Sequence, residues 1–177
     1  MEKVHTNNPT AGQFHNRGYE HLKSIYLLKE AQAKAPLQAA SMYILPLLAL
    51  QSARLAIDEY VNLTGRKVDP AWDEVDWEAA SIQERIAYIF RKMGQSPGFE
   101  SDTWEEVLTL FETAGLIKGD LSEMRKLHRE EIPEEFKDIA VEYPIYRSLA
   151  IAEQAIDLLL DQSDFNSPLN KDETLTK

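Results

Sequence analysis

The sequence predicts an all-α protein: a bundle of five to six helices with two or three long helices at its centre. In every apolar segment the hydrophobic residues recur with the period of a helix, and no segment shows the apolar–polar alternation of a strand. The chain of 177 residues contains only seven glycines, which also argues against a sheet protein. Its length fits a single domain. Its hydrophobic fraction of 44% and charged fraction of 28% are ordinary for a soluble globular protein.

The first helix is expected over residues 14–35, where apolar residues recur at helical spacing until Pro36 ends the pattern. The residues before it, 1–13, are polar and include an Asn-Asn-Pro run, so we expect a disordered lead-in. Residues 163–177 are polar in the same way and are expected to form a disordered tail. The predicted domain is therefore a single helical bundle over residues 14–162.

The second helix, over residues 38–63, is the most apolar segment of the chain and is expected to lie at the centre of the bundle. Pro46 lies inside it and removes one backbone hydrogen bond, so we expect a kink there or a helix start nearer Tyr43. Gly65 is expected to end this helix as a left-handed cap. The core positions predicted for this helix are Leu47, Leu48, Leu55 and Val61.

The segment after the second helix, residues 66–78, reads as an acidic loop. It contains Trp72 and Trp77, which we expect to anchor it against the bundle. A third helix follows over residues 79–93, because isoleucine and phenylalanine side chains recur there at helical spacing. Gly94 is expected to close that helix.

A fourth helix is expected over residues 103–114, with Ser101 or Asp102 as its cap. Its apolar stripe is regular, so it should pack against the bundle. A fifth helix is expected over residues 120–131, and Pro133 should end it.

The last part of the bundle is expected to form a short helix over residues 134–143 and a long final helix over residues 144–160. Pro144 suits the first turn of the final helix, where its missing N–H has no partner to lose. The final helix carries apolar residues at helical spacing and should pack on the other long helices.

Charge and composition narrow the classes of partner. The formal net charge of −11 repels phosphate at long range, so nucleic acid is not a favoured partner. The candidate for a local basic patch is the mixed-charge segment 118–129, and RNA binding stays an alternative because of it. The chain has no cysteine, and its longest apolar run, 42–50, is shorter than the roughly 20 residues that a bilayer requires. The N-terminus lacks the apolar core of a signal peptide, so we expect a soluble cytoplasmic protein with no membrane partner.

No pattern in the sequence indicates a metal or cofactor site. A di-iron bundle needs Glu-x-x-His on two helices, and that spacing occurs nowhere in the chain. His15 and His21 lie six residues apart and would not share one tight face of a helix. The chain also lacks a glycine-rich phosphate loop and a serine nucleophile elbow. We expect neither a metal nor a cofactor.

A polar stripe runs along the apolar second helix. Gln51, Arg54, Asp58 and Asn62 follow one another at intervals of three, four and four, so they share one face of that helix. Charged groups beside a core are usually paired or functional. We expect Arg54 and Asp58 to be partly buried and bonded to each other or to the final helix. The stripe of Arg54, Asp58 and Asn62 is also a candidate binding site for a small molecule or a nucleotide.

A second candidate site is His128 with Arg125. A histidine can take a proton from a ribose 2′-hydroxyl, and an arginine can stabilise the charge that then develops on phosphorus. On a helix the two side chains would be neighbours at positions i and i+3. The pair is therefore the minimum apparatus of a ribonuclease that works without a metal. The alternative is that His128 is a surface residue at the end of a charged helix.

The order of these features resembles the HEPN-like group of bacterial helical domains (higher eukaryotes and prokaryotes nucleotide-binding). The likeness covers roughly residues 38–160 and rests on three segments. The first is the end of a long helix, AIDEYVN at 56–62; the second is a Trp-bearing loop followed by SIQERI at 81–86. The third is the segment LSEMRKLH at 121–128, which carries the arginine and the histidine.

The resemblance implies a helical bundle, frequent dimerisation, and in many members RNA cleavage by a toxin or defence nuclease. The family's motif has more residues between its arginine and histidine than the two that separate Arg125 from His128. We therefore expect a non-catalytic HEPN-like domain that acts by self-association or by binding a protein partner, with the ribonuclease and the small-molecule binder as alternatives. A homodimer is expected because the sequence predicts more aromatic surface than one small bundle can cover, from four residues: Phe99, Trp104, Tyr143 and Tyr146.

Overall fold

The computed structural model describes residues 11–36, 38–117, 121–124, 126 and 129–161, and among these residues it contains helices, turns and loops but no strand. The all-α prediction is therefore confirmed. Six helices of nine residues or more lie in the described part of the chain, which agrees with the predicted bundle. The prediction of a lead-in over residues 1–13 is wrong for Ala11 to Gln13, which belong to the first helix. The rest of the predicted lead-in and the predicted tail lie outside the described residues.

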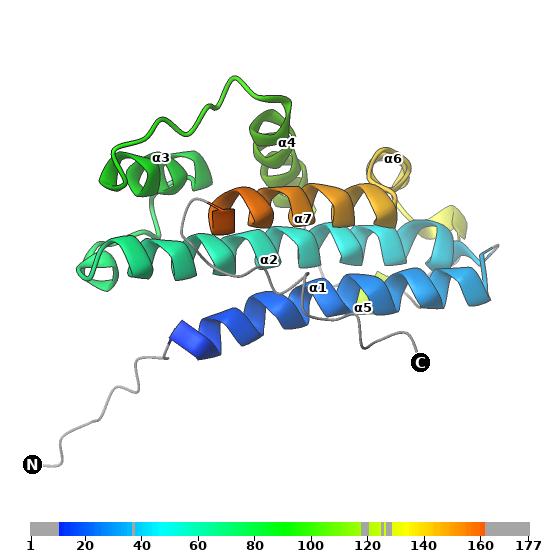
Figure 1. Cartoon of the computed structure of the whole chain (residues 1–177). Coiled ribbons are helices and arrows are strands. Elements are labelled where there is room, and N and C mark those ends of the chain that lie inside the picture. Colours follow the sequence, from blue (N-terminus) through cyan, green and yellow to red (C-terminus); the bar gives the residue numbers. More distant parts are fainter. Residues whose placement is uncertain (1–10, 37, 118–120, 125, 127–128, 162–177) are drawn as a thin grey trace, which may run out of the picture.

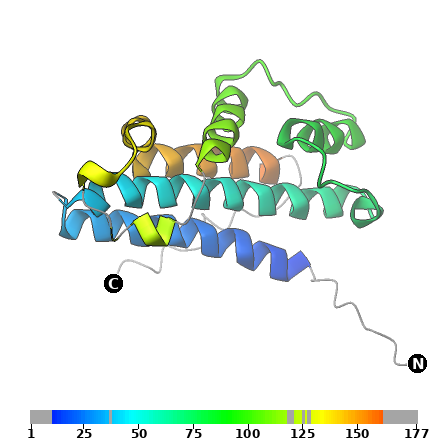
Figure 2. The same ribbon diagram turned by 180° about the vertical axis from the view of Figure 1, so that it is seen from behind.

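Three long helices form the centre of the bundle: α1 (Ala11–Lys34), α2 (Leu45–Val68) and α7 (Ile145–Asp161). They lie side by side, with α1 antiparallel to α2, and α7 running in the same direction as α2 (Figures 1 and 2). The close approach of α1 to α2 depends on Gly18, because a Cβ there would lie 2.6 Å from the ring of Tyr60. The long helices predicted from the sequence are thus the ones at the centre.

The helix α2 and the turn before it, Ala40–Val68, form the most apolar part of the bundle. By length and composition alone this 29-residue helix could cross a membrane, since an 18-residue window within it has a mean hydropathy of 1.4. In the fold, 56% of that window is buried within the protein. Leu47 and Val61 are completely buried as predicted and Leu48 is partly buried, but the prediction for Leu55 is wrong, since it is 44% exposed.

The chain before α2 is irregular, as Pro46 predicted. Residues Ala40–Ile44 form a short π-helix, η1, which the N–H of Leu45 closes by donating to the carbonyl of Ala40. The α-helix then begins at Leu45, and Pro46 stands in its first turn, directly after the π-helix. The irregularity is therefore a π turn that leads directly into a regular helix.

The prediction that Gly65 caps α2 is wrong. The helix continues to Val68, and the N–H of Asp69 donates to the Gly65 carbonyl at 2.9 Å. A Cβ at Gly65 would lie 2.3 Å from the indole ring of Trp72, so the glycine makes room for that side chain. Sequence reasoning identified the special residue but gave it the wrong role.

The loop after α2 is held by an aromatic cluster, as predicted. Trp72, in the short 3₁₀ helix η2 (Trp72–Glu74), is only 1% exposed. Trp77 stacks on it with ring centroids 4.3 Å apart and donates its indole N–H to the Trp72 carbonyl at 2.8 Å. The ring of Tyr88 meets both indoles edge-on. This cluster joins the end of α2 to the next helix.

One carboxylate of this region, Asp69, makes the stability of the fold depend on pH in the acidic range. It accepts hydrogen bonds from the Tyr88 hydroxyl and the Ala71 N–H and pairs with Lys92 at 3.0 Å, and these contacts lower its pKa from 3.8 to about 2. The stabilisation is complete above pH 3.8 and is lost as the pH falls towards 2. Urea unfolding across that range should show a weaker pH dependence for Asp69→Asn than for the parent. Asp138→Asn, at an exposed position, should leave the pH dependence of the parent unchanged.

Two further helices, α3 (Ile82–Lys92) and α4 (Asp102–Leu116), lie on the same side of α2 and are joined by a long loop (Figure 1). Gly94, with φ of +70°, follows α3 and is the predicted glycine stop. Ser101 is the N-cap residue of α4, although its side chain makes no capping hydrogen bond. The hydrophobic side chains of α3 and α4 join the main core.

The segment between α4 and α7 differs most from the prediction. The described residues of the predicted helix 120–131 form a four-residue helix, α5 (Leu121–Met124), and a 3₁₀ turn, η3 (Arg129–Glu131). The short helix α6 (Glu134–Glu142) is present as predicted. It packs on η1, and the two build a small second core with Ile44, Phe136 and Ala140 at its centre.

Candidate binding pocket between α2, α3 and α4

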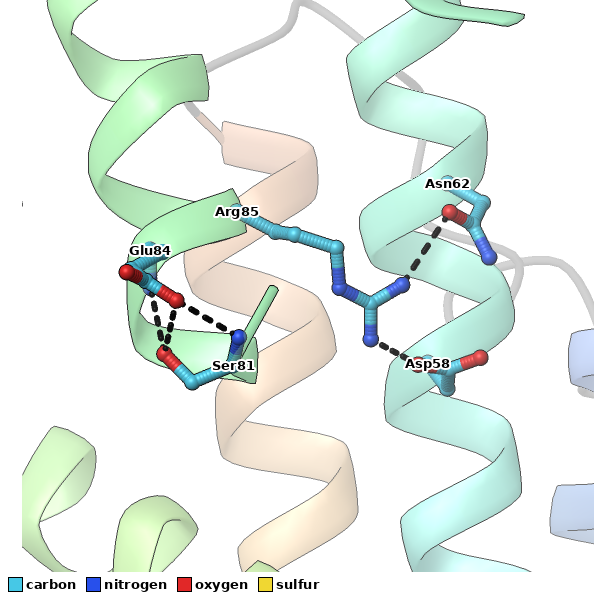
Figure 3. Close-up of polar contacts among 5 residues, drawn as sticks. All are labelled: Asp58, Asn62, Ser81, Glu84 and Arg85. Atoms are coloured by element: carbon cyan, nitrogen blue, oxygen red, sulfur yellow. Dashed lines mark hydrogen bonds and ion pairs between the residues drawn. The ribbon is translucent and has the colours of Figure 1, made fainter. Parts of the chain in front are cut away.

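The polar stripe of α2 is engaged by an arginine from α3. The guanidinium of Arg85 donates from Nη2 to the carboxylate of Asp58 and from Nη1 to the side-chain oxygen of Asn62 at 3.3 Å (Figure 3). The Arg85 side chain is 11% exposed and that of Asp58 is 34% exposed. Asp58 is therefore partly buried, as expected, and one cation ties two members of the stripe to a neighbouring helix.

The partner predicted for Asp58 is wrong. It pairs with neither Arg54 nor the final helix, because α3 covers this part of the stripe and supplies Arg85. The guanidinium of Arg54 lies instead over the ring of Phe111 in α4, 5.8 Å from its centroid. Gln51, one turn earlier, donates to the Ala114 carbonyl of α4 at 2.8 Å. The stripe thus contacts two helices, α4 through its first half and α3 through its second.

A capping box fixes the start of α3 and so the position of Arg85. Ser81 accepts a hydrogen bond from the Glu84 N–H at 3.2 Å, and the Glu84 carboxylate accepts one from the Ser81 N–H at 2.7 Å (Figure 3). The Glu84 carboxylate also accepts a hydrogen bond from the Ser81 hydroxyl, and the bonds from the N–H and hydroxyl of Ser81 together lower the pKa of Glu84. Because Arg85 directly follows Glu84, the capping box fixes which part of α2 the Arg85 side chain can reach.

An open pocket of about 530 Å³ lies beside this ion pair. That volume is within the ordinary range for small-molecule sites. Arg54 and Asp58 form its wall on α2, whereas Asn62 lies outside it and acts through Arg85. The other lining residues that matter for its chemistry are Trp77, Glu78, Arg85, Leu108, Phe111 and Glu112.

The charges around the pocket are of both signs. Arg85 and Asp58 neutralise each other. Within the described part of the chain, no ion pair is formed by the side chains of Arg54, Glu78 or Glu112. The pocket therefore offers one guanidinium and two carboxylates that are still able to bind a ligand.

A second hollow, of about 370 Å³, lies where the loop after α3 passes over the core. It is bordered by Phe90, Trp104 and Leu158 and by the polar loop residues before α4, and no charged residue lines it. It offers a ligand little that would fix its orientation. Of these two hollows in the described part of the chain, the pocket beside Asp58 combines a cavity with charged side chains.

The other predicted site, His128 with Arg125, lies outside the described residues, so its geometry stays a prediction. Among the described residues, no group of three histidine, aspartate or glutamate side chains is arranged to hold a metal ion. No protein-family model, curated protein or solved structure shows significant similarity to this chain. The inference on function accordingly rests on the pocket.

Proposed function

We propose that this protein is a non-catalytic helical binding domain whose pocket between α2, α3 and α4 receives a small polar molecule. The observation that carries this proposal is the position of the α2 stripe, whose two charged members, Arg54 and Asp58, both line the pocket. Arg85 is held in place by Asp58 and Asn62, so the polar wall is ordered before a ligand arrives. The pocket contains carboxylates, guanidinium groups and aromatic rings, and none of its lining residues is a histidine.

The proposal is tested by measuring melting temperatures of the purified protein against amino acids, amines, nucleotides and carboxylic acids. A ligand of the native state raises the melting temperature. Ala80→Trp, which places an indole in the pocket, should abolish the shift caused by a true ligand. Ala31→Trp, at an exposed position of α1, should retain it. A screen without any shift that Ala80→Trp removes would reject the proposal.

Self-association in the cytoplasm, as in HEPN-like relatives, is a second part of the proposal and rests on the resemblance alone. The argument from aromatic surface is wrong for two of its residues, since Trp104 is 2% and Tyr143 1% exposed in the monomer. Phe99 is partly buried against Trp104, and only Tyr146 is largely exposed, at 69%. Light scattering at tens of micromolar distinguishes a dimer from the 20.2 kDa monomer.

We also expect that the protein does not cleave RNA. The spacing of Arg125 and His128 is shorter than in the family motif, and the net charge of −11 opposes the approach of the substrate. Incubation with single-stranded RNA and transfer RNA should leave both intact. Cleavage by the parent that His128→Ala abolishes would instead make the protein a ribonuclease with His128 as its base.

A further inference from the structure

The three charges of the pocket that have no ion-pair partner constrain its ligand. A ligand of one sign would satisfy only part of the site: a phosphate or nucleotide would face Glu78 and Glu112, and a simple amine would leave Arg54 without a counter-ion. A ligand that carries both an anion and a cation can meet both requirements. The charges that line the pocket therefore favour a zwitterion over a nucleotide.

Arg54 provides the site for the anion. Its guanidinium carbon lies over the ring of Phe111, 5.8 Å from the ring centroid, and its side chain forms no ion pair within the described part of the chain. The N–H donors of a guanidinium form a planar fork that matches a planar anion in a bidentate contact. A carboxylate fits that geometry and is small enough to share the pocket with the rest of a ligand.

The balance of charge indicates more than one cationic group. The lining contains two guanidinium groups, Arg54 and Arg85, and three carboxylates, Asp58, Glu78 and Glu112, which leaves one negative charge in excess. A ligand with one carboxylate and two cations would neutralise that excess. Its apolar stem would lie against Leu108, Phe111 or Trp77, which provide the apolar and aromatic part of the lining.

We infer that the pocket binds a basic α-amino acid, with its carboxylate on Arg54 and its cationic groups facing Glu78 and Glu112. This inference rests on the proposed function and names the class of ligand for the same site. It assigns separate roles to the two signs of charge, and those roles can be tested with matched ligands.

Three probes separate the roles in calorimetric titrations: L-arginine, agmatine, which lacks the carboxylate, and citrulline, which lacks the guanidinium charge. Arginine should bind more tightly than either of the others. Arg54→Ala should weaken arginine binding about tenfold or more, the scale of a lost hydrogen-bonded charge pair, and should not weaken agmatine binding, because agmatine has no carboxylate to lose that contact.

Removing the two carboxylates tests the cationic end. The double variant Glu78→Gln with Glu112→Gln should weaken both arginine and agmatine about tenfold or more. The matched control, Glu30→Gln with Glu135→Gln, removes two exposed carboxylates elsewhere and should change neither affinity by more than about twofold, the scale of screened surface charges. Circular dichroism checks that each variant is folded.

Several results would overturn the inference. They are the absence of arginine binding at millimolar concentration, equal affinity for all three probes, or equal weakening by the pocket pair and the control pair. A nucleotide or dicarboxylate whose thermal shift is lost in Ala80→Trp would also overturn it, while the proposed binding function would stand.

Discussion

Replacing Gly65 by alanine should destabilise the protein by about 2–3 kcal/mol, the scale of overpacking in a tight core. The new Cβ would lie 2.3 Å from the indole of Trp72, a distance that no native contact tolerates. Trp72 cannot easily move away, because it is 1% exposed, stacks on Trp77 and accepts a hydrogen bond from it at its own carbonyl. Relief of the clash would therefore disturb the whole aromatic cluster.

The control for this experiment is Gly115→Ala in α4. Gly115 is also a helical glycine, but it is exposed and a Cβ there would meet no atom within 4 Å. That change should stabilise the protein by up to about 1 kcal/mol, because alanine favours a helix over glycine. Urea unfolding of both variants gives the comparison. If both substitutions stabilise the protein equally, the close contact between Gly65 and Trp72 does not exist in solution.

The same glycine explains one limit of prediction from sequence. A glycine after a long apolar helix usually marks a C-cap, and that local rule predicted an end at residue 63, five residues before the actual end at Val68. The actual reason for Gly65 is the ring of a residue beyond the end of the helix, and the packing of that ring is not visible in local sequence. The effect of Pro46 was easier to predict, because a proline lacks the N–H that its own helix would use and so disturbs the hydrogen bonding of the residues just before it.

The candidate site was predictable to a similar extent. The spacing of Arg54, Asp58 and Asn62 placed them correctly on one face of a core helix, because helical period is a local property. Their partners, Phe111 and Arg85, depend on which helices cover that face, and this is decided by tertiary packing. One signal was present: Ser81 and Glu84 form the Ser-x-x-Glu pattern of a capping box, and that pattern fixes where α3 begins.

The fifth helix shows how charge and amphipathic spacing can mislead. Residues 120–131 carry apolar side chains at helical intervals, but only Leu121–Met124 form an α-helix among the described residues, and a 3₁₀ turn follows at Arg129–Glu131. A helix this short has little hydrogen bonding of its own, so packing decides its extent. Leu121 and Met124 are partly buried against the small second core.

Asp58→Ala should destabilise the protein by about 2–3 kcal/mol. This cost lies below the roughly 3–5 kcal/mol of a fully buried broken pair, because the Asp58 side chain is 34% exposed. Most of the cost comes from the partner: Arg85 is 11% exposed and its Nε already lacks an acceptor, so the loss of Asp58 leaves a poorly hydrated cation. Arg85→Met should lower the free energy of unfolding by less, because water can hydrate the Asp58 carboxylate that it releases. The double variant Asp58→Ala with Arg85→Met should be more stable than Asp58→Ala alone.

The surface pair of Arg66 with Asp73 is the natural control, with an ion-pair distance of 2.7 Å and side chains that are 23% and 45% exposed. Asp73→Ala should cost no more than about 1 kcal/mol, as expected for a solvated pair. If urea unfolding shows that Asp58→Ala destabilises the protein no more than Asp73→Ala does, the pair of Arg85 with Asp58 behaves as a solvated surface pair. The pocket wall would then be mobile and would not be ordered before binding. A larger cost for Asp58→Ala means that the same ion pair both closes the contact between α2 and α3 and orders the charged wall of the pocket.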